Sequence, residues 1–239
     1  MHPVIVVVVL IGACCSFIVS SSVGFGGSLL MVPVLVLAVG AKDGVALAAL
    51  LLASNNVFKL LAYRATVPWR VATGIAIATV VGAAFGARLL LGVPNVAVVV
   101  AVLLMFTMTL AFERSAFEPG QRFAGPWLAL VSGATSGFSG TSGPLKGVAI
   151  RNLGLDRLHF VGAASLVSFS GDATKVLVFT DGELLGLSEY LLALAVLPLM
   201  LLGTGIGRRI NRRAGERLFA GMFWTVMVGY SVRLVTTVT

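Results

Sequence analysis

Long uninterrupted apolar runs constrain this chain more than any other feature of its sequence. They cover residues 4–20, 71–91, 96–112 and 188–206, and each approaches or exceeds the roughly 20 residues that a helix needs to cross a hydrocarbon layer about 30 Å thick. A soluble domain cannot bury this excess, because 58% of the residues are hydrophobic and only 11% are charged, against about half and about a quarter in ordinary soluble proteins. The runs therefore predict an all-α polytopic membrane protein.

The basic residues fall mainly between these runs. Lysine and arginine outnumber aspartate and glutamate by 17 to 9, which in a soluble protein would suggest nucleic acid as a partner. Basic residues between membrane spans instead set the orientation in the bilayer. We therefore expect the lipid bilayer as a partner and no nucleic acid. The first 20 residues lack the basic start of a secretory signal, so residue 1 is expected to remain in the mature protein.

Catalytic, redox and metal chemistry find no support in the sequence. Cys14 and Cys15 are adjacent in an apolar run with no other cysteine to pair with, so we interpret them as small apolar side chains. His2 and His159 each lack a second metal ligand at useful spacing. Ser170 lacks the surroundings of a nucleophile elbow. We predict no enzyme activity, no cofactor and no metal site.

Two similar segments indicate an internal repeat. Val23-Gly-Phe-Gly-Gly27 resembles Ser136-Gly-Phe-Ser-Gly140, 113 positions later. About 30 residues after each segment comes an amide or carboxylate followed three residues on by lysine, as Asn56 with Lys59 and Asp172 with Lys175. Two matches in the same order favour a duplication. The predicted units are a first transmembrane repeat at 1–112, a cytoplasmic linker at 113–126 and a second transmembrane repeat at 127–239.

Charge placement predicts that the two halves have opposite orientations. The strongest basic loops are placed in the cytoplasm and the acidic loop at 181–183 outside; the basic loops hold Arg64 and Arg70, and Arg208, Arg209, Arg212 and Arg213. Residues 127–150 then start and end in the cytoplasm, and their glycines and Pro144 indicate a broken or re-entrant helix hairpin. Residues 4–40 are its counterpart from outside. Each half would add about three transmembrane helices, and an odd number of crossings inverts the second half.

Glycine, serine and threonine residues at the two breaks form the candidate anion site. Glycine lets the backbone leave the helix, and a helix that restarts there presents free N–H groups with a partial positive charge. Close packing of helices through small residues is the alternative interpretation. The candidate substrate-binding residues at the breaks are Ser22, Gly24, Gly26, Gly27, Ser28, Ser136, Gly137, Ser139, Gly140, Thr141 and Ser142.

Two lysines inside apolar segments extend the candidate site. Lys59 and Lys175, together with Asn56, are added as substrate-binding residues, because an ammonium group in the membrane should face a cavity and attract an anion. Two alternatives remain open for the lysines. Lys59 lies close enough to the end of its span to reach the interface, and Lys175 could pair with Asp172, one helical turn earlier. Asp172 is also the candidate for carrying a coupling proton.

These motifs together resemble a known family of membrane permeases. Gly24-Phe-Gly-Gly27 followed by Pro33, its echo at Gly137-Phe-Ser-Gly140 before Pro144, the Asn56-x-x-Lys59 pattern and the two-repeat layout look like the TauE/SafE sulfite exporter family. The resemblance covers nearly the whole chain. It implies a multi-pass carrier of the bacterial inner membrane that exports sulfite, sulfoacetate or another sulfur-containing or organic anion.

The second half departs from the first at two of these positions. Ser139 stands where the first half has Gly26, and Asp172 stands where it has Asn56. The carboxylate argues against a fully symmetric anion site. We predict a secondary transporter for a small anionic substrate, such as sulfite, a sulfonate or a related sulfur oxyanion, working by alternating access. An anion channel and a carrier of a non-sulfur organic carboxylate are the alternatives, and homodimer formation is left open.

Overall fold

The computed structural model describes residues 3–23, 26–112, 125–142 and 144–213. Every regular element in these ranges is helical, as predicted. The predicted linker lies almost entirely outside the described residues, as do Gly24 and the chain after Arg213. The elements are α1 (Pro3–Val23), α2 (Gly27–Val39), α3 (Ala41–Tyr63), the 3-10 turn η1 (Arg64–Thr66), α4 (Trp69–Gly92), α5 (Asn95–Phe112), α6 (Gly125–Ser139), α7 (Pro144–Arg151), α8 (Arg157–Asp181) and α9 (Leu187–Arg213).

Three of these helices are long and apolar enough to cross a membrane. They cover Ala41–Thr66, Trp69–Gly92 and Leu187–Asn211, and shorter apolar helices cover Leu10–Ser22, Gly27–Val39 and Asn95–Met105. The length and composition of these helices are those of a membrane protein.

The distribution of side chains across the bundle leads to the same conclusion. Large apolar side chains such as Phe85 on α4 and Leu202 on α9 are exposed on the outer surface, 61% and 62% respectively. The ammonium groups of Lys59 and Lys175 belong to completely buried side chains. An apolar exterior around a charged interior is the reverse of a soluble protein and suits a lipid surround.

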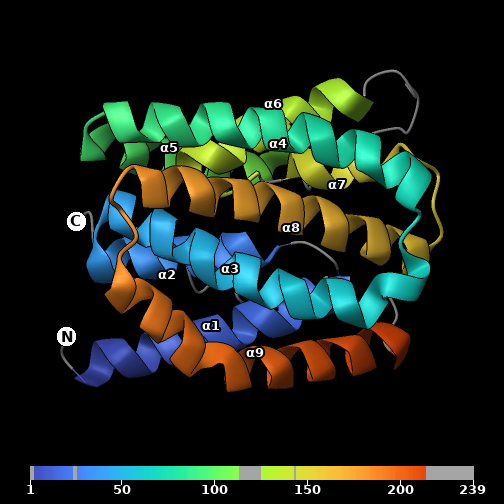
Figure 1. The fold of residues 1–239 in the computed structure, drawn as a ribbon, viewed down its shortest axis with the longest axis horizontal. Coiled ribbons are helices and arrows are strands. Elements are labelled where there is room, and N and C mark those ends of the chain that lie inside the picture. Colours follow the sequence, from blue (N-terminus) through green and yellow to red (C-terminus); the bar gives the residue numbers. More distant parts are fainter. Residues whose placement is uncertain (1–2, 24–25, 113–124, 143, 214–239) are drawn as a thin grey trace.

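Helices α3 and α8 lie side by side in the middle of the bundle (Figure 1). On one side of this pair α1 packs against α9, and on the other side α4 packs against α6. Helix α2 packs on α1 and α3, while α7 packs on α6 and α8. The α1–α2 hairpin enters from the left end of the view and the α6–α7 hairpin from the right end. Both hairpins therefore bring their breaks to the central pair.

Left-handed glycines mark the two predicted breaks. Gly26 has a φ of 93° and Gly140 a φ of 78°, which residues with a Cβ atom disfavour. Helix α1 ends before the first glycine and α2 begins after it, and the second glycine separates α6 from α7 in the same way. The interruption of both helices is therefore confirmed.

Helices α4 and α6 touch through their backbones. A Cβ atom added to Gly82 or Gly86 on α4 would overlap backbone atoms of α6, and one added to Gly133 or Gly137 on α6 would overlap backbone atoms of α4. Small residues at such positions let membrane helices approach closely. Gly137, a candidate for the anion site, thus lies where the alternative interpretation placed it, in a helix contact.

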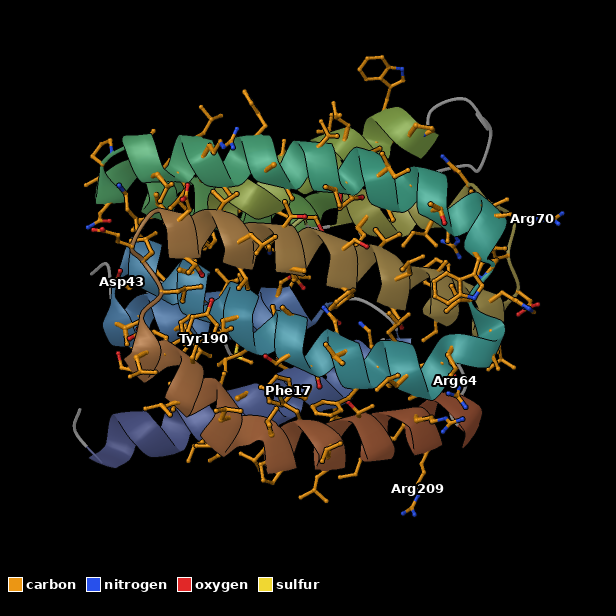
Figure 2. All side chains as sticks on the ribbon, viewed as in Figure 1. Phe17, Asp43, Arg64, Arg70, Tyr190 and Arg209 are labelled. Carbon is orange, nitrogen blue, oxygen red and sulfur yellow. The ribbon has the colours of Figure 1, made fainter. Side chains whose placement is uncertain are left out.

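The arginines of the two basic loops lie at one end of the bundle. Figure 2 shows Arg64, Arg70 and Arg209 at one end and Asp43 at the other. The two basic loops therefore share one end, as the charge pattern predicted. Loops rich in arginine and lysine face the cytoplasm in membrane proteins.

Candidate functional site

The two helix breaks meet in the interior of the bundle. Ser28 at the start of α2 and Thr141 in the α6–α7 break are 113 positions apart, and their hydroxyl oxygens are 3.3 Å from one another. Gly140 lies against α2, because a Cβ atom there would be 2.8 Å from a methyl carbon of Val32. The structure thus brings together the two segments that the sequence pointed to separately.

A buried lysine donates to a serine on the first helix of each broken hairpin. Lys59 Nζ of α3 donates to Ser20 Oγ of α1 at 3.1 Å, and Lys175 Nζ of α8 donates to Ser136 Oγ of α6 at 3.1 Å. In both pairs the lysine follows the serine by 39 positions. Both lysine side chains are fully buried, so Lys59 does not extend to the membrane interface.

Asp172 links the matched positions of α3 and α8. Its Oδ1 atom forms an ion pair of 2.6 Å with Lys175 Nζ, and its Oδ2 atom accepts from Asn56 Nδ2 at 2.7 Å. The internal ion pair that the sequence left open is therefore present. Asn56 and Asp172, 116 positions apart, are the amide and carboxylate of the two repeated motifs, and they contact one another directly.

Lys146 of α7 adds a third buried ammonium group, which the sequence interpretation did not include. Its side chain is 8% exposed, and its Nζ atom lies 3.4 Å from Ser168 Oγ of α8. A signal for this residue existed, because a lysine within a short apolar segment beside a helix break is unusual in a membrane. Ser20 and Ser168 were also missed as site residues, since no spacing rule shows which hydroxyl a lysine will contact.

These residues surround one small pocket. Among the described residues its walls come from α1, the first break, the start of α2, α3, α7 and α8: Ser20, Gly26, Gly27, Ser28, Leu52, Asn56, Lys146, Ser168 and Asp172. As bounded by these residues, the pocket has room for about one water molecule. A larger ligand would therefore require the walls to move apart.

Five of the predicted site residues line the pocket, and the others that the structure describes do not. The lining members are Gly26, Gly27, Ser28, Asn56 and Asp172. Among the rest, Ser22 donates to the Val19 carbonyl and Ser139 to the Thr135 and Thr141 carbonyls. Thr141 and Ser142 are buried at the second break, and Lys175 reaches the pocket through Asp172.

The charges and dipoles of this region suit an anion. Three lysines face a single carboxylate within the buried cluster. Helix α2 begins at Gly27, so its first N–H groups and the positive end of its dipole lie at the pocket wall. Within the part of the chain that the structure describes, no group of three or more histidine, cysteine or acidic residues could hold a metal ion.

Apolar helices around a small polar pocket beside two helix breaks are typical of membrane transporters. A family model described as Sulfite exporter TauE/SafE matches residues 8–234. The chain therefore belongs to the TauE/SafE sulfite exporter family, which confirms the resemblance carried by its glycine motifs. No curated protein and no solved structure matches the chain.

Proposed function

We propose that this protein is a secondary carrier that exports a small sulfur oxyanion, sulfite or a sulfonate, by alternating access. One observation carries this assignment: the two helix breaks meet beside a small pocket, in a buried cluster where three lysines, one of which lines the pocket, accompany one carboxylate. Excess buried positive charge is costly in a membrane. An anion that enters the pocket would offset this cost, which gives the site its selectivity for negative charge.

The donors around the pocket suit an ion with several charged oxygens. Lys146 offers its ammonium group, Ser20, Ser28 and Ser168 offer hydroxyl groups, and the start of α2 offers backbone N–H groups. Oxyanions accept several charge-assisted hydrogen bonds at once. Because the pocket holds about one water molecule in this conformation, the bound anion must push the two breaks apart, beginning with the Ser28–Thr141 contact.

Three structural correspondences support an inverted repeat with halves at 1–112 and 127–239. The Lys59–Ser20 and Lys175–Ser136 bonds have equal lengths and equal spacings. The first hairpin helix of each half packs against the helix that follows the buried lysine of the other half, as α1 with α9 and α6 with α4. The two hairpins also enter from opposite ends of the bundle (Figure 1). Inverted halves of this kind exchange two conformations around a fixed central site.

Asp172 is the residue that we assign to coupling. It accepts from Asn56 and pairs with Lys175, so a proton on Asp172 would weaken both contacts. Lys175 would then be free to attract the substrate anion. Proton binding and anion binding would in this way favour the same state, which is the requirement for coupled transport.

The direct test is counterflow of radiolabelled sulfite in proteoliposomes. We expect saturable exchange that is faster than net flow, and a loss of about tenfold or more in Lys146→Met, because a hydrogen bond to a charged group contributes roughly 1.5–3 kcal/mol. Lys42→Met is the matched control, because Lys42 Nζ donates to the Leu91 carbonyl and does not line the pocket. Both variants are checked for folding by size-exclusion chromatography.

The same assay separates the alternatives. Unchanged sulfite flux in Lys146→Met, Lys175→Met and Gly27→Leu would show that the site is elsewhere. Flux without saturation or accelerated exchange would indicate an anion channel. Inhibition by organic carboxylates, with no effect of sulfite or sulfoacetate, would indicate a carboxylate carrier.

A further inference from the structure

A second buried polar cluster lies outside the pocket, where α1, α3 and α9 meet. We call it the polar seam, and it consists of Ser21, Ser22, Asn55, Thr204 and Asn211. We propose that the polar seam is a hydrated path along which the anion passes between the central pocket and the arginine-bearing end of α9. The identity of the cargo rests on the proposed function, whereas the hydration of the seam can be measured without transport.

The polar seam contains hydrogen-bonding atoms that the protein leaves unused. Thr204 Oγ1 donates to Asn55 Oδ1 at 3.1 Å and is 3.3 Å from Ser21 Oγ, while Asn211 Nδ2 donates to the Ser22 carbonyl. Asn55 Nδ2 and Asn211 Oδ1 have no hydrogen-bond partner among the described residues, although the two residues are only 0% and 3% exposed. Buried amide groups of this kind require partners, which water supplies.

At its inner end the polar seam includes direct sequence neighbours of two residues that line the pocket. Asn55 precedes Asn56 and Ser21 follows Ser20, and both neighbours line the pocket. At its outer end Asn211 follows Arg208 and Arg209, and Figure 2 shows Arg209 extending from the bundle at the end that also carries Arg64. Thr204 and Asn211 lie two turns apart on the buried face of α9. The proposed path would therefore run from the pocket, which Lys146 lines, to a surface that carries arginines.

The α4–α6 contact on the other side of the bundle provides a comparison for the α1–α9 contact. Gly207 on α9 faces the Ile18 carbonyl of α1, and Gly86 on α4 faces the Ala134 carbonyl of α6. Ile18 and Ala134 are matched by the same spacing as Ser20 and Ser136. By this match Thr204 and Asn211 correspond to Ala83 and Leu90, both completely buried and apolar. At these two matched positions the α1–α9 side is therefore polar where the α4–α6 side is apolar.

Cysteine accessibility provides the test, in a background carrying Cys14→Ala and Cys15→Ala. Thr204→Cys and Asn211→Cys are compared with Ala83→Cys and Leu90→Cys in inside-out vesicles, using a membrane-impermeant maleimide. Sulfite is left out, because it adds to maleimides. We expect the two polar-seam cysteines to react at least about tenfold faster than their counterparts, which can react only through local opening.

Equal reaction rates at the four positions would overturn the proposal. A measurement on the unmodified chain covers the case in which a cysteine variant does not fold. Tyr63 donates to the Ser21 carbonyl at 2.9 Å, and its counterpart Phe179 is completely buried. Hydroxyl radicals generated in bound water should oxidise Tyr63 and spare Phe179, and protection of both would contradict hydration.

The two proposals can fail independently. Reactive cysteines in a protein that exchanges no sulfur oxyanion would uphold the hydrated seam and refute the proposed substrate. Sulfite counterflow in a protein whose Thr204→Cys and Asn211→Cys variants stay unreactive would uphold the carrier and refute the path.

Discussion

The contact between α4 and α6 and the contact between α1 and α9 correspond to one another under the proposed repeat, but they differ in composition. Glycines lie on both sides of the α4–α6 contact, and a Cβ atom at any of the four would overlap backbone of the facing helix. The α1–α9 contact has glycines only on α9, at 203 and 207. Its α1 side instead contributes the Ser21 hydroxyl group and the Ser22 carbonyl group to the polar seam.

This difference bears on which part of the bundle moves. Backbones in contact on both sides resist sliding, because any shift brings a Cα atom into a carbonyl group. A contact that includes hydrogen bonds and water can rearrange by exchanging partners. We infer that α4 and α6 move as one body with their half-site and that α1 shifts against α9 when the pocket opens.

The largest expected effect concerns the buried lysines that contact α6 and α1. Lys175→Met should lower the free energy of unfolding by about 3–5 kcal/mol, because it leaves the Asp172 carboxylate buried without its cation. Lys59→Met should cost less than Lys175→Met, because the α1 acceptor that loses its donor, Ser20 Oγ, is an uncharged hydroxyl. Unfolding by SDS titration in mixed micelles, followed by circular dichroism, measures both.

The double variant Lys175→Met/Asp172→Asn serves as the control for this comparison. It removes both charges, so most of the stability lost in Lys175→Met should return. Equal losses in the two single lysine variants, or no recovery in the double variant, would show that the Asp172 ion pair does not distinguish the two halves.

The second prediction compares glycine substitutions in the α4–α6 and α1–α9 contacts. Gly86→Ala should lower the free energy of unfolding by about 3 kcal/mol, because only backbone separation can accommodate the new methyl group. Gly207→Ala should cost about 1 kcal/mol. The atoms nearest the added Cβ atom are the Ile18 carbonyl oxygen at 2.6 Å and Ser21 Cβ at 2.7 Å, and both belong to the C-terminal part of α1, which we expect to shift. The same SDS titration applies.

Gly205→Ala is the matched control for the glycine substitutions. Gly205 is in α9, and no atom lies within 4 Å of a Cβ atom placed there. Stability should therefore stay the same or rise slightly, through the higher helix propensity of alanine. A loss at Gly207 as large as that at Gly86 would mean that the two contacts are equally rigid.

The helix breaks and the buried lysines could be predicted from the sequence, whereas the residues that they contact could not. The two breaks followed from clustered glycines, and the lysines stood out because charge is rare inside apolar segments. The sequence did not reveal that Gly137 packs on α4, because glycine serves helix breaks and close packing alike. Lys146 and the polar seam were missed for a related reason: their meaning depends on which helices meet, and spacing along one helix does not contain that information.

Exchanging the residue types of Asn211 and Leu90 tests the polar seam with a smaller expected change in stability. Asn211→Leu gives α9 the residue found at its counterpart Leu90, and it removes an amide that the protein only partly satisfies. We expect the free energy of unfolding to change by less than about 1 kcal/mol while sulfite exchange slows. Leu90→Asn should instead cost about 2 kcal/mol, because it buries an unpartnered amide in a dry contact. Unaltered exchange in Asn211→Leu would separate the polar seam from transport.

The smallest expected effect is a difference in acid sensitivity between the first residues of α3 and those of α8. Helix α3 follows Gly40 and has no side-chain cap, whereas α8 follows Asp156, whose carboxylate accepts from the His159 N–H at 3.0 Å. That hydrogen bond, with a second contact from the His159 ring, lowers the pKa of Asp156 below its ordinary value. A lowered pKa adds stability above the ordinary value, and this stability is lost as pH falls through the folded-state value.

Asp156→Asn should keep the cap and remove this part of the acid sensitivity, because asparagine caps helices about as well as aspartate without titrating. Thermal unfolding in detergent between neutral pH and about pH 3 provides the measurement. The wild-type midpoint should fall more steeply over this range than that of the variant. Because the carboxylate is fully exposed, solvent screening keeps the difference small. Parallel curves would mean that the start of α8 is no more sensitive to acid than the uncapped start of α3, and the two halves would then differ only in their interior.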